Sequence, residues 1–308
     1  MNLKVQENVP LASLTTFEIG GAAKYFTEVS TEAEIQEAVQ WARERNVPFI
    51  VLAGGSNILV PDNGLSALVV RVTGSDFTIE GDMLEAHPGC NLLSLIHAAS
   101  EKGLGGWEKL AGIPGTIGGA VRGNAGAFGP EIKDFVTKIC AFDVESGEVR
   151  KFTNEECEFA YRMSFFKKNP NWVITHVTLR LQPVQYEISN RLANETIAER
   201  ERRHIQNVRA AGSYFMNPVA PTNVIEMFEK EKGVKSRGGR VPAGWLIEKA
   251  GMKGAKVGDA QASLQHPNYI VNTGNATAAQ VRELAEKVKT AVEEKFGVRL
   301  DEEAVILS

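Results

Sequence analysis

The sequence predicts an α+β fold made of two or three small domains, and three observations support this. The chain has 308 residues, 43% of them apolar, which is enough to build more than one hydrophobic core. It opens with a β-α-β pattern and continues with a region rich in strands. From about residue 185 the composition turns charged and helical, and we expect a domain boundary there.

We interpret the opening as a β-α-β unit from one predicted helix and two predicted strands. Residues 30–46 have helical periodicity, and Thr31 with Glu34 forms a capping box at the start. The apolar residues that repeat on one face are Ile35, Ala38, Val39 and Ala42. Apolar runs at 48–53 and 67–72 predict the two strands.

Turn and alternation signals predict the middle of the chain. Residues 77–89 predict a hairpin that turns at Gly81 and Asp82, and residues 91–103 predict a helix that ends at Gly103. Strands are then expected at 136–144, 148–152 and 172–182.

A long helix is predicted at 277–297, near the end of the chain. Thr277 and Gln280 form a capping box at its start. Its apolar stripe, which we expect to be core, consists of Val281, Leu284, Val288 and Val292.

The composition disfavours several classes of function. With 34 basic and 38 acidic residues the formal charge is -4, which argues against a nucleic-acid partner. Cys90, Cys140 and Cys157 are odd in number and lack metal-ligand spacing, so we expect buried, reduced thiols and no metal site. The chain shows neither the apolar core of a signal peptide nor a run long enough to span a bilayer, so we expect a cytoplasmic protein without a membrane partner.

Two glycine-rich segments are candidates for binding a phosphate-bearing ligand. In "VLAGGSNILV" (51–60) an apolar strand runs into a turn that can form an anion nest, or a plain connection between strands. The turn residues are Gly54, Gly55, Ser56 and Asn57. The second segment, "AGIPGTIGGAVRGNAGAFG" (111–129), has seven glycines among nineteen residues and fits neither the dinucleotide fingerprint nor the P-loop. It suits backbone that lies against a large, flat ligand with a diphosphate.

Two other motifs carry polar side chains suited to chemistry. Tyr161 and Arg162 are adjacent in "AYRMSFFKK" (160–168), and the guanidinium fork suits a carboxylate, although a surface ion pair is the alternative. In "AGSYFMNP" (211–218), Ser213 follows a glycine without a G-x-S-x-G frame. The missing frame disfavours a hydrolase triad. The remaining roles for Ser213 are a proton donor or a plain turn hydroxyl.

These motifs together resemble the UDP-N-acetylenolpyruvoylglucosamine reductase (MurB) family over nearly the whole chain. The motifs that occur in the family's order are "TTFEIGG" (15–21), "VLAGGSN", "GIPGTIGGAVRGNAGAFG", "YRMSFFKK", "AGSYFMNP", "AGWLIEKAGMKG" (243–254), "HPNYIVN" (266–272) and "LDEE" (300–303). The short span between Tyr161 and Ser213 resembles the compact type, which lacks the long lid.

The resemblance implies a two-part FAD-binding domain of the vanillyl-alcohol-oxidase (PCMH) type plus a smaller α+β substrate domain. The implied division is 1–72 and 73–186 for the two FAD-binding parts, 187–298 for the substrate-binding domain and 299–308 for a C-terminal strand that carries the active-site glutamate. A monomer is expected.

The resemblance also implies non-covalent FAD, NADPH as the reductant, and reduction of an enolpyruvyl UDP-sugar to UDP-N-acetylmuramate for peptidoglycan synthesis. The family's proton-donating serine falls on Ser213, its arginine on Arg162 and its glutamate on Glu303. A positioned arginine, and a glutamate that is protonated or hydrogen-bonding, can stabilise the enolate-like charge that hydride addition creates. The implied FAD-binding residues are Gly54, Gly55, Ser56, Asn57, Gly112, Pro114, Gly115, Gly118, Gly119, Asn124 and Gly126. The implied substrate-binding residues are Tyr161, Asn217 and His266, the last of which has a purely structural role as an equal alternative.

Two departures from the family pattern bear on affinity, and two other functions compete. Met216 stands where the family usually has lysine, and Arg122 with Gly123 replaces an uncharged pair. A flavin oxidase of the same fold would usually tether FAD through His or Cys, and His87 and Cys90 lie upstream of the long glycine segment. A flavin- or nucleotide-sugar-binding protein without catalysis is the third hypothesis.

Overall fold

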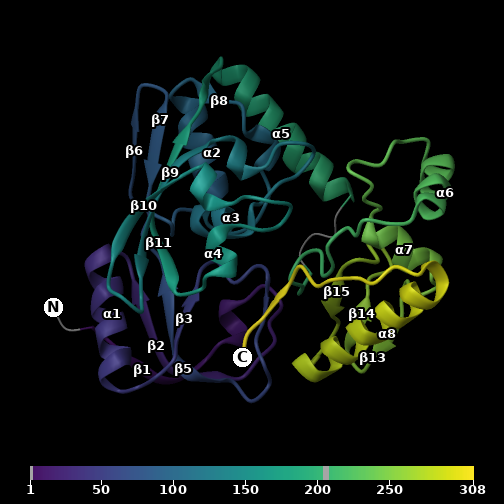
Figure 1. Cartoon of the computed structure of the whole chain (residues 1–308), viewed down its shortest axis with the longest axis horizontal. Coiled ribbons are helices and arrows are strands. Elements are labelled where there is room, and N and C mark those ends of the chain that lie inside the picture. The colour runs from purple at the N-terminus through teal and green to yellow at the C-terminus, as the bar shows by residue number, and fades with distance from the viewer. Residues whose placement is uncertain (1–2, 204–207) are drawn as a thin grey trace. The chain divides into compact units, whose positions relative to one another are not determined.

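The computed structural model describes residues 3–203 and 208–308, and the chain divides into two compact units (Figure 1). Unit 1 comprises Met1–Val9, Ala23–Gly54 and Ser66–Arg202. Unit 2 comprises Pro10–Ala22, Gly55–Leu65 and Arg203–Ser308. Each unit is therefore assembled from separate pieces of the chain.

Unit 1 contains a four-stranded sheet in the order β1-β2-β5-β3. Its strands are β1 (Gln6–Pro10), β2 (Ala22–Val29), β3 (Phe49–Leu52) and β5 (Leu65–Val72). Helix α1 (Glu32–Glu44) begins at Thr31, whose hydroxyl accepts from the Glu34 N–H, while the Glu34 carboxylate accepts from the Ser30 N–H. The predicted apolar stripe of α1 is buried, and β3 and β5 pair in parallel. The predicted helix and the two strands after it are confirmed.

The second sheet of unit 1 is antiparallel, in the order β10-β9-β11-β7-β6. Its strands are β6 (Phe77–Glu80), β7 (Met83–Ala86), β9 (Val136–Asp143), β10 (Val149–Thr153) and β11 (Trp172–Arg180). A short strand pair joins β8 (Leu104–Gly105) to β12 (Gln182–Pro183). The helices of this part are α2 (Leu92–Glu101), α3 (Ile117–Gly123), α4 (Phe165–Lys168) and α5 (Tyr186–Arg203). Phe142 of β9 and Val173 of β11 share a core with α1, so the two sheets of unit 1 pack together.

Unit 2 packs three helices against short strands. The elements are α6 (Thr222–Lys232), α7 (Ala243–Lys249), α8 (Ala278–Phe296), the antiparallel set β13 (Lys256–Val257), β14 (Ala260–Ala262) and β15 (Ile270–Asn272), and the parallel pair β4 (Ile58–Leu59) and β16 (Val305–Ile306). The capping box of Thr277 and Gln280 and the buried stripe of α8 are confirmed. The Asp62 carboxylate adds a second cap, because it accepts from the N–H groups of Ala278 and Ala279.

Helix α5 lies in a different unit from the one that the sequence suggested. The boundary was expected near residue 185, yet α5 packs within unit 1. Ala193 is part of the unit 1 core, and the Ser189 hydroxyl donates to Glu108 Oε1 at 2.6 Å. The reason is a buried hydrogen bond and an apolar contact, neither of which the charged composition of the helix reveals.

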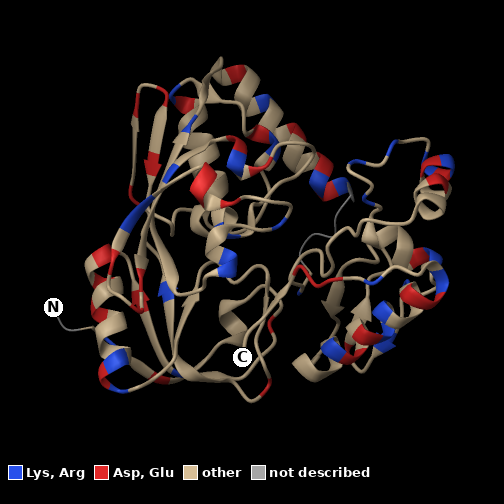
Figure 2. Cartoon of the chain, viewed as in Figure 1, with Lys and Arg blue, Asp and Glu red and all other residues tan. Residues whose placement is uncertain are grey.

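The expectations about cysteines, charges and membrane spans can also be compared with the structure. All three cysteines are free; Cys90 and Cys157 are buried, as expected, but Cys140 is partly exposed on strand β9. Acidic and basic side chains are interspersed along α5 and α8 (Figure 2). Within the described ranges no helix is both long and apolar enough to cross a membrane.

Candidate active site

The two glycine-rich segments touch each other in unit 1. Gly54 follows strand β3, and Gly115 precedes helix α3. A Cβ atom on Gly54 would lie 3.0 Å from Gly115 Cα, closer than ordinary packing allows. The N–H groups of Gly54 and Gly55 donate to no acceptor among the described residues. Gly54 is exposed, whereas Gly55 is buried beside Leu14. The contact therefore leaves bare backbone with an exposed donor at Gly54, which suits a diphosphate.

Part of the long glycine segment forms helix α3, which was not among the elements predicted from the sequence. The Thr116 hydroxyl caps α3 by accepting from the Gly119 N–H at 3.2 Å. The Gly118 N–H donates to Pro88 O at 2.9 Å, and a Cβ on Gly118 would lie 2.6 Å from Pro88 Cβ. Gly118 therefore serves packing within the protein, whereas Gly119 is exposed and has room for a ligand beside it.

The start of the segment is covered by α5. The Gly112 carbonyl accepts from Arg200 Nε at 3.1 Å, and a Cβ on Gly112 would lie 3.0 Å from Arg200 Cδ. Pro114, two residues on, is exposed. Both residues were expected to bind FAD. The structure places Gly112 against Arg200 and Pro114 on the surface.

Three hydrogen bonds join the end of the glycine segment to the Tyr161–Arg162 motif. Arg162 Nη2 donates to Gly126 O at 3.0 Å, Asn124 Nδ2 to Ala160 O at 2.8 Å, and Ser164 Oγ to Arg122 O at 2.7 Å. The end of the glycine segment and the Tyr161–Arg162 motif, which are separate in the sequence, therefore lie side by side in the structure.

Arg162 and Asn124 have different environments in this region. The Arg162 guanidinium lies 5.1 Å from the centre of the Tyr161 ring. Asn124 is 0% exposed, and its side chain also accepts from the Lys133 N–H. The side chain of Asn124 therefore holds the segment in place, and the residue, although expected to bind FAD, is buried within the protein. Burial lowers the pKa of the Arg122 guanidinium beside it.

In unit 2, Ser213 and Glu303 lie on neighbouring backbone segments. The Glu303 N–H donates to Tyr214 O at 2.8 Å, and the Met216 N–H donates to Asp301 O at 2.8 Å. This antiparallel pairing brings together residues about ninety positions apart in the sequence. Within the described chain, the Ser213 hydroxyl forms no hydrogen bond.

Asn57 links the short glycine turn to the Glu303 segment. Its Nδ2 donates to Glu303 O at 3.1 Å, and Val305 N donates to Asn57 O at 3.0 Å. The parallel pair of β4 and β16 continues this contact. Asn57, expected as an FAD ligand, thus also supports the peptide that carries the carboxylate; Ser56 beside it is partly buried.

Asn217 and His266 also lie in unit 2. Asn217 Oδ1 accepts from Ala243 N at the start of α7, at 2.9 Å. His266 packs edge-on against Tyr269 at 4.9 Å between ring centres, and burial lowers the pKa of its imidazole.

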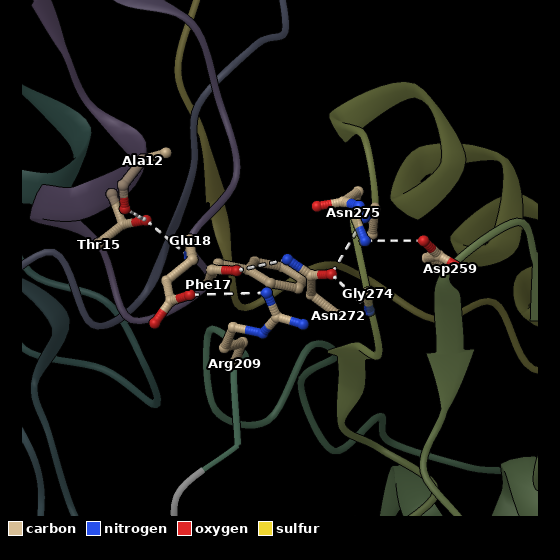
Figure 3. A network of polar contacts seen from close by, with 10 residues as sticks. Ala12, Thr15, Phe17, Glu18, Arg209, Asp259, Asn272, Gly274 and Asn275 are labelled. Atoms are coloured by element: carbon tan, nitrogen blue, oxygen red, sulfur yellow. Dashed lines mark hydrogen bonds and ion pairs between the residues drawn. The ribbon is translucent and has the colours of Figure 1, made fainter.

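Side chains that the sequence reasoning missed join two sequence motifs within unit 2 (Figure 3). Asn272 Nδ2 donates to Phe17 O at 3.3 Å, and the Arg209 guanidinium lies 3.6 Å from the Glu18 carboxylate. The Asn272 N–H donates to Arg209 O. These contacts join the "TTFEIGG" motif to the "HPNYIVN" motif. The only sequence signal for this connection was that both motifs belong to the set that resembles one family.

Two family models match this chain, and the first of them defines the class of protein. Residues 23–153 match the family described as FAD binding domain, so the chain carries the fold of an FAD-binding protein. Residues 203–307 match the family described as UDP-N-acetylenolpyruvoylglucosamine reductase, C-terminal domain.

Full-length relatives then identify the family. UDP-N-acetylenolpyruvoylglucosamine reductase from Solibacter usitatus is 36% identical, covering 98% of this chain and 96% of that protein. The reductase from Pseudomonas aeruginosa is 35% identical, covering 98% and 99%. The crystal structure of MurB from Thermus caldophilus matches with a TM-score of 0.80 and 32% identity over 100% of both chains. The chain belongs to the UDP-N-acetylenolpyruvoylglucosamine reductase family.

Proposed function

We propose that this protein is an FAD-dependent reductase that converts UDP-N-acetylenolpyruvoylglucosamine to UDP-N-acetylmuramate with NADPH, in the synthesis of peptidoglycan precursors. Family membership over 98% of the chain supports the reaction. The observation that carries the site is the pairing of the Ser213 and Glu303 segments through the Tyr214 carbonyl. We further propose that the protein acts as a cytoplasmic monomer.

The residues around the glycine contact fit FAD. The close approach of Gly54 to Gly115 leaves no space for a side chain at Gly54, and the N–H group of the exposed Gly54 provides a donor for a diphosphate. Gly119 leaves open space beside helix α3. When bound, FAD supplies hydride transfer from NADPH to the enolpyruvyl double bond.

Ser213 is proposed to donate the proton that completes the reduction. Hydride addition to the outer carbon of the double bond places negative charge on the carbon next to the carboxylate, and this carbon must then be protonated. A hydroxyl is a weak acid, so its position within hydrogen-bond reach matters more than its pKa. The Ser213 hydroxyl forms no hydrogen bond with the described residues, which supports this role.

Arg162, and Glu303 in its protonated form, which can donate a hydrogen bond, are proposed to stabilise the negative charge that develops during this step. A guanidinium pairs with the substrate carboxylate through two parallel donors. The Arg162 side chain is oriented by the Gly126 carbonyl and by the Tyr161 ring, which supports a fixed direction for its fork. Loss of one such stabilising donor typically costs about 10²- to 10³-fold in rate. Tyr161, Asn217 and His266 remain proposed substrate contacts.

The test separates the two half-reactions. NADPH should bleach the yellow protein anaerobically, and the enolpyruvyl UDP-sugar should restore the colour. Ser213→Ala should leave bleaching intact and slow the return of colour. Colourless protein that cannot take up FAD would refute the proposal, and equal rates in both half-reactions of Ser213→Ala would refute the role of Ser213 alone.

The oxidase alternative is disfavoured by the environment of the two candidate tethering residues. His87 is 7% exposed and Cys90 is 3% exposed. The Cys90 thiol donates to Asp76 O at 3.3 Å, and burial raises its pKa to about 11. A buried, protonated thiol is a poor nucleophile. Rapid reaction of the reduced protein with oxygen would support the oxidase instead, and binding without turnover would support the non-catalytic hypothesis.

A further inference from the structure

Asn268 makes a compact set of hydrogen bonds to the two residues that follow Ser213. It is 3% exposed. Its Nδ2 donates to Phe215 O at 2.9 Å, and its Oδ1 accepts from Phe215 N at 3.0 Å. Its own carbonyl accepts from Tyr214 N at 2.7 Å. The amide side chain thus acts as a strand partner that bonds both backbone polar groups of one residue, Phe215.

The opposite edge of the same segment is held by the glutamate strand. Tyr214 O accepts from Glu303 N, and Phe215 forms a β-bridge with Glu302. The segment after Ser213 is therefore held from both sides. On the other side of Ser213, Gly212 has φ +73°, a conformation that favours glycine. The backbone on either side of Ser213 therefore has a defined conformation.

We propose that Asn268 is a positioning residue for proton transfer by Ser213. This inference rests on the proposed function. Asn268 fixes the Tyr214–Phe215 peptide and thereby aims the hydroxyl of the preceding residue. A small displacement of a reacting group can cost about 10²-fold in rate, so loss of this support should act on the proton step.

Asn268→Asp changes one bond while keeping the size of the side chain. The carboxylate can still accept from Phe215 N, but its second oxygen faces Phe215 O and replaces attraction with repulsion. Asn272→Asp is a matched control. Asn272 is 5% exposed, donates from Nδ2 to Phe17 O, and accepts at Oδ1 from Gly274 N at 3.2 Å and Ala276 N at 3.0 Å (Figure 3).

Each substitution therefore removes one donor to a backbone carbonyl and keeps the acceptor, in the same motif and the same unit. Of these two side chains, only that of Asn268 bonds a residue that follows Ser213, so only Asn268→Asp should affect proton transfer by Ser213. Asn268→Ala adds no charge and provides a second variant if Asn268→Asp does not fold.

The experiment measures both half-reactions of the FAD-loaded variants by stopped flow. We expect Asn268→Asp to be bleached by NADPH close to the wild-type rate and to be reoxidised by the enolpyruvyl UDP-sugar about 10- to 100-fold more slowly. The solvent deuterium isotope effect on reoxidation should rise, because proton transfer becomes slower. Asn272→Asp should show neither change.

A double variant tests the route of the effect. In the Ser213→Ala background, Asn268→Asp should add no further slowing, since both act on one step. Equal slowing of both half-reactions, additivity with Ser213→Ala, or the same selective loss in Asn272→Asp would overturn the inference. A wild-type protein that shows neither half-reaction would instead refute the proposed function, so the two failures are distinguishable.

Discussion

The neighbouring glycines Gly118 and Gly119 provide a test of where the flavin lies. A Cβ on Gly118 would lie 2.6 Å from Pro88 Cβ, inside the protein. A Cβ on Gly119 would have Thr116 Oγ1 at 3.6 Å and Ala53 Cβ at 3.9 Å as its nearest neighbours, which are ordinary contacts. The same added methyl group therefore meets protein at one position and, on our proposal, ligand at the next.

The expected magnitudes follow from this geometry. Forcing a methyl group into a packed site costs about 1–3 kcal/mol, so Gly118→Ala should lower the free energy of unfolding of the apoprotein by about that amount. Gly119→Ala should leave it unchanged or raise it by up to about 1 kcal/mol, because alanine favours a helix over glycine. If the flavin lies against Gly119, the same steric cost appears in binding, and FAD affinity should fall about 5- to 150-fold.

Two assays separate these effects. Urea denaturation of the apoprotein measures stability, and quenching of flavin fluorescence on titration measures FAD affinity. Gly119→Ala that binds FAD as tightly as wild type would refute the position that we assign to the flavin. A stable Gly118→Ala would refute the packing argument.

Three further predictions concern other parts of the chain. Arg162→Lys, which loses the planar fork, should slow reoxidation by the UDP-sugar about 10²-fold in stopped flow; an unchanged rate would contradict its role. Burial lowers the pKa of His87 below its usual 6.5, so the unfolded chain takes up a proton first and stability should fall as the pH drops below that value. His87→Gln should make stability fall less steeply with decreasing pH, as measured by urea denaturation at several pH values. The same pH dependence in the variant and the wild type would contradict this role of His87. Asp62→Ala, which removes the acceptor for the first N–H groups of α8, should cost about 1 kcal/mol in urea denaturation, whereas no loss would show that the Thr277 cap suffices.

The sequence by itself determined the elements whose signals are local. The cap of α1 at Thr31, the capping box of α8 and the hairpin turn at Gly81 were all predicted, because each depends on residues a few positions apart. The apolar stripes likewise follow from a period of about 3.6 residues. Even α3 has a local signal, since Thr116 caps it, but seven glycines obscured that signal.

Only the tertiary structure decided which of these pieces meet. The contact of Gly54 with Gly115, the bond from Arg162 to Gly126 O and the pairing of Tyr214 with Glu303 join residues far apart in the chain. Such contacts depend on how sheets and helices pack. Every residue has a backbone carbonyl, so the sequence does not show which carbonyl accepts a hydrogen bond from a residue far along the chain. The residue types needed for the chemistry can therefore be predicted from the motifs, while the partners that hold those residues in place depend on the fold.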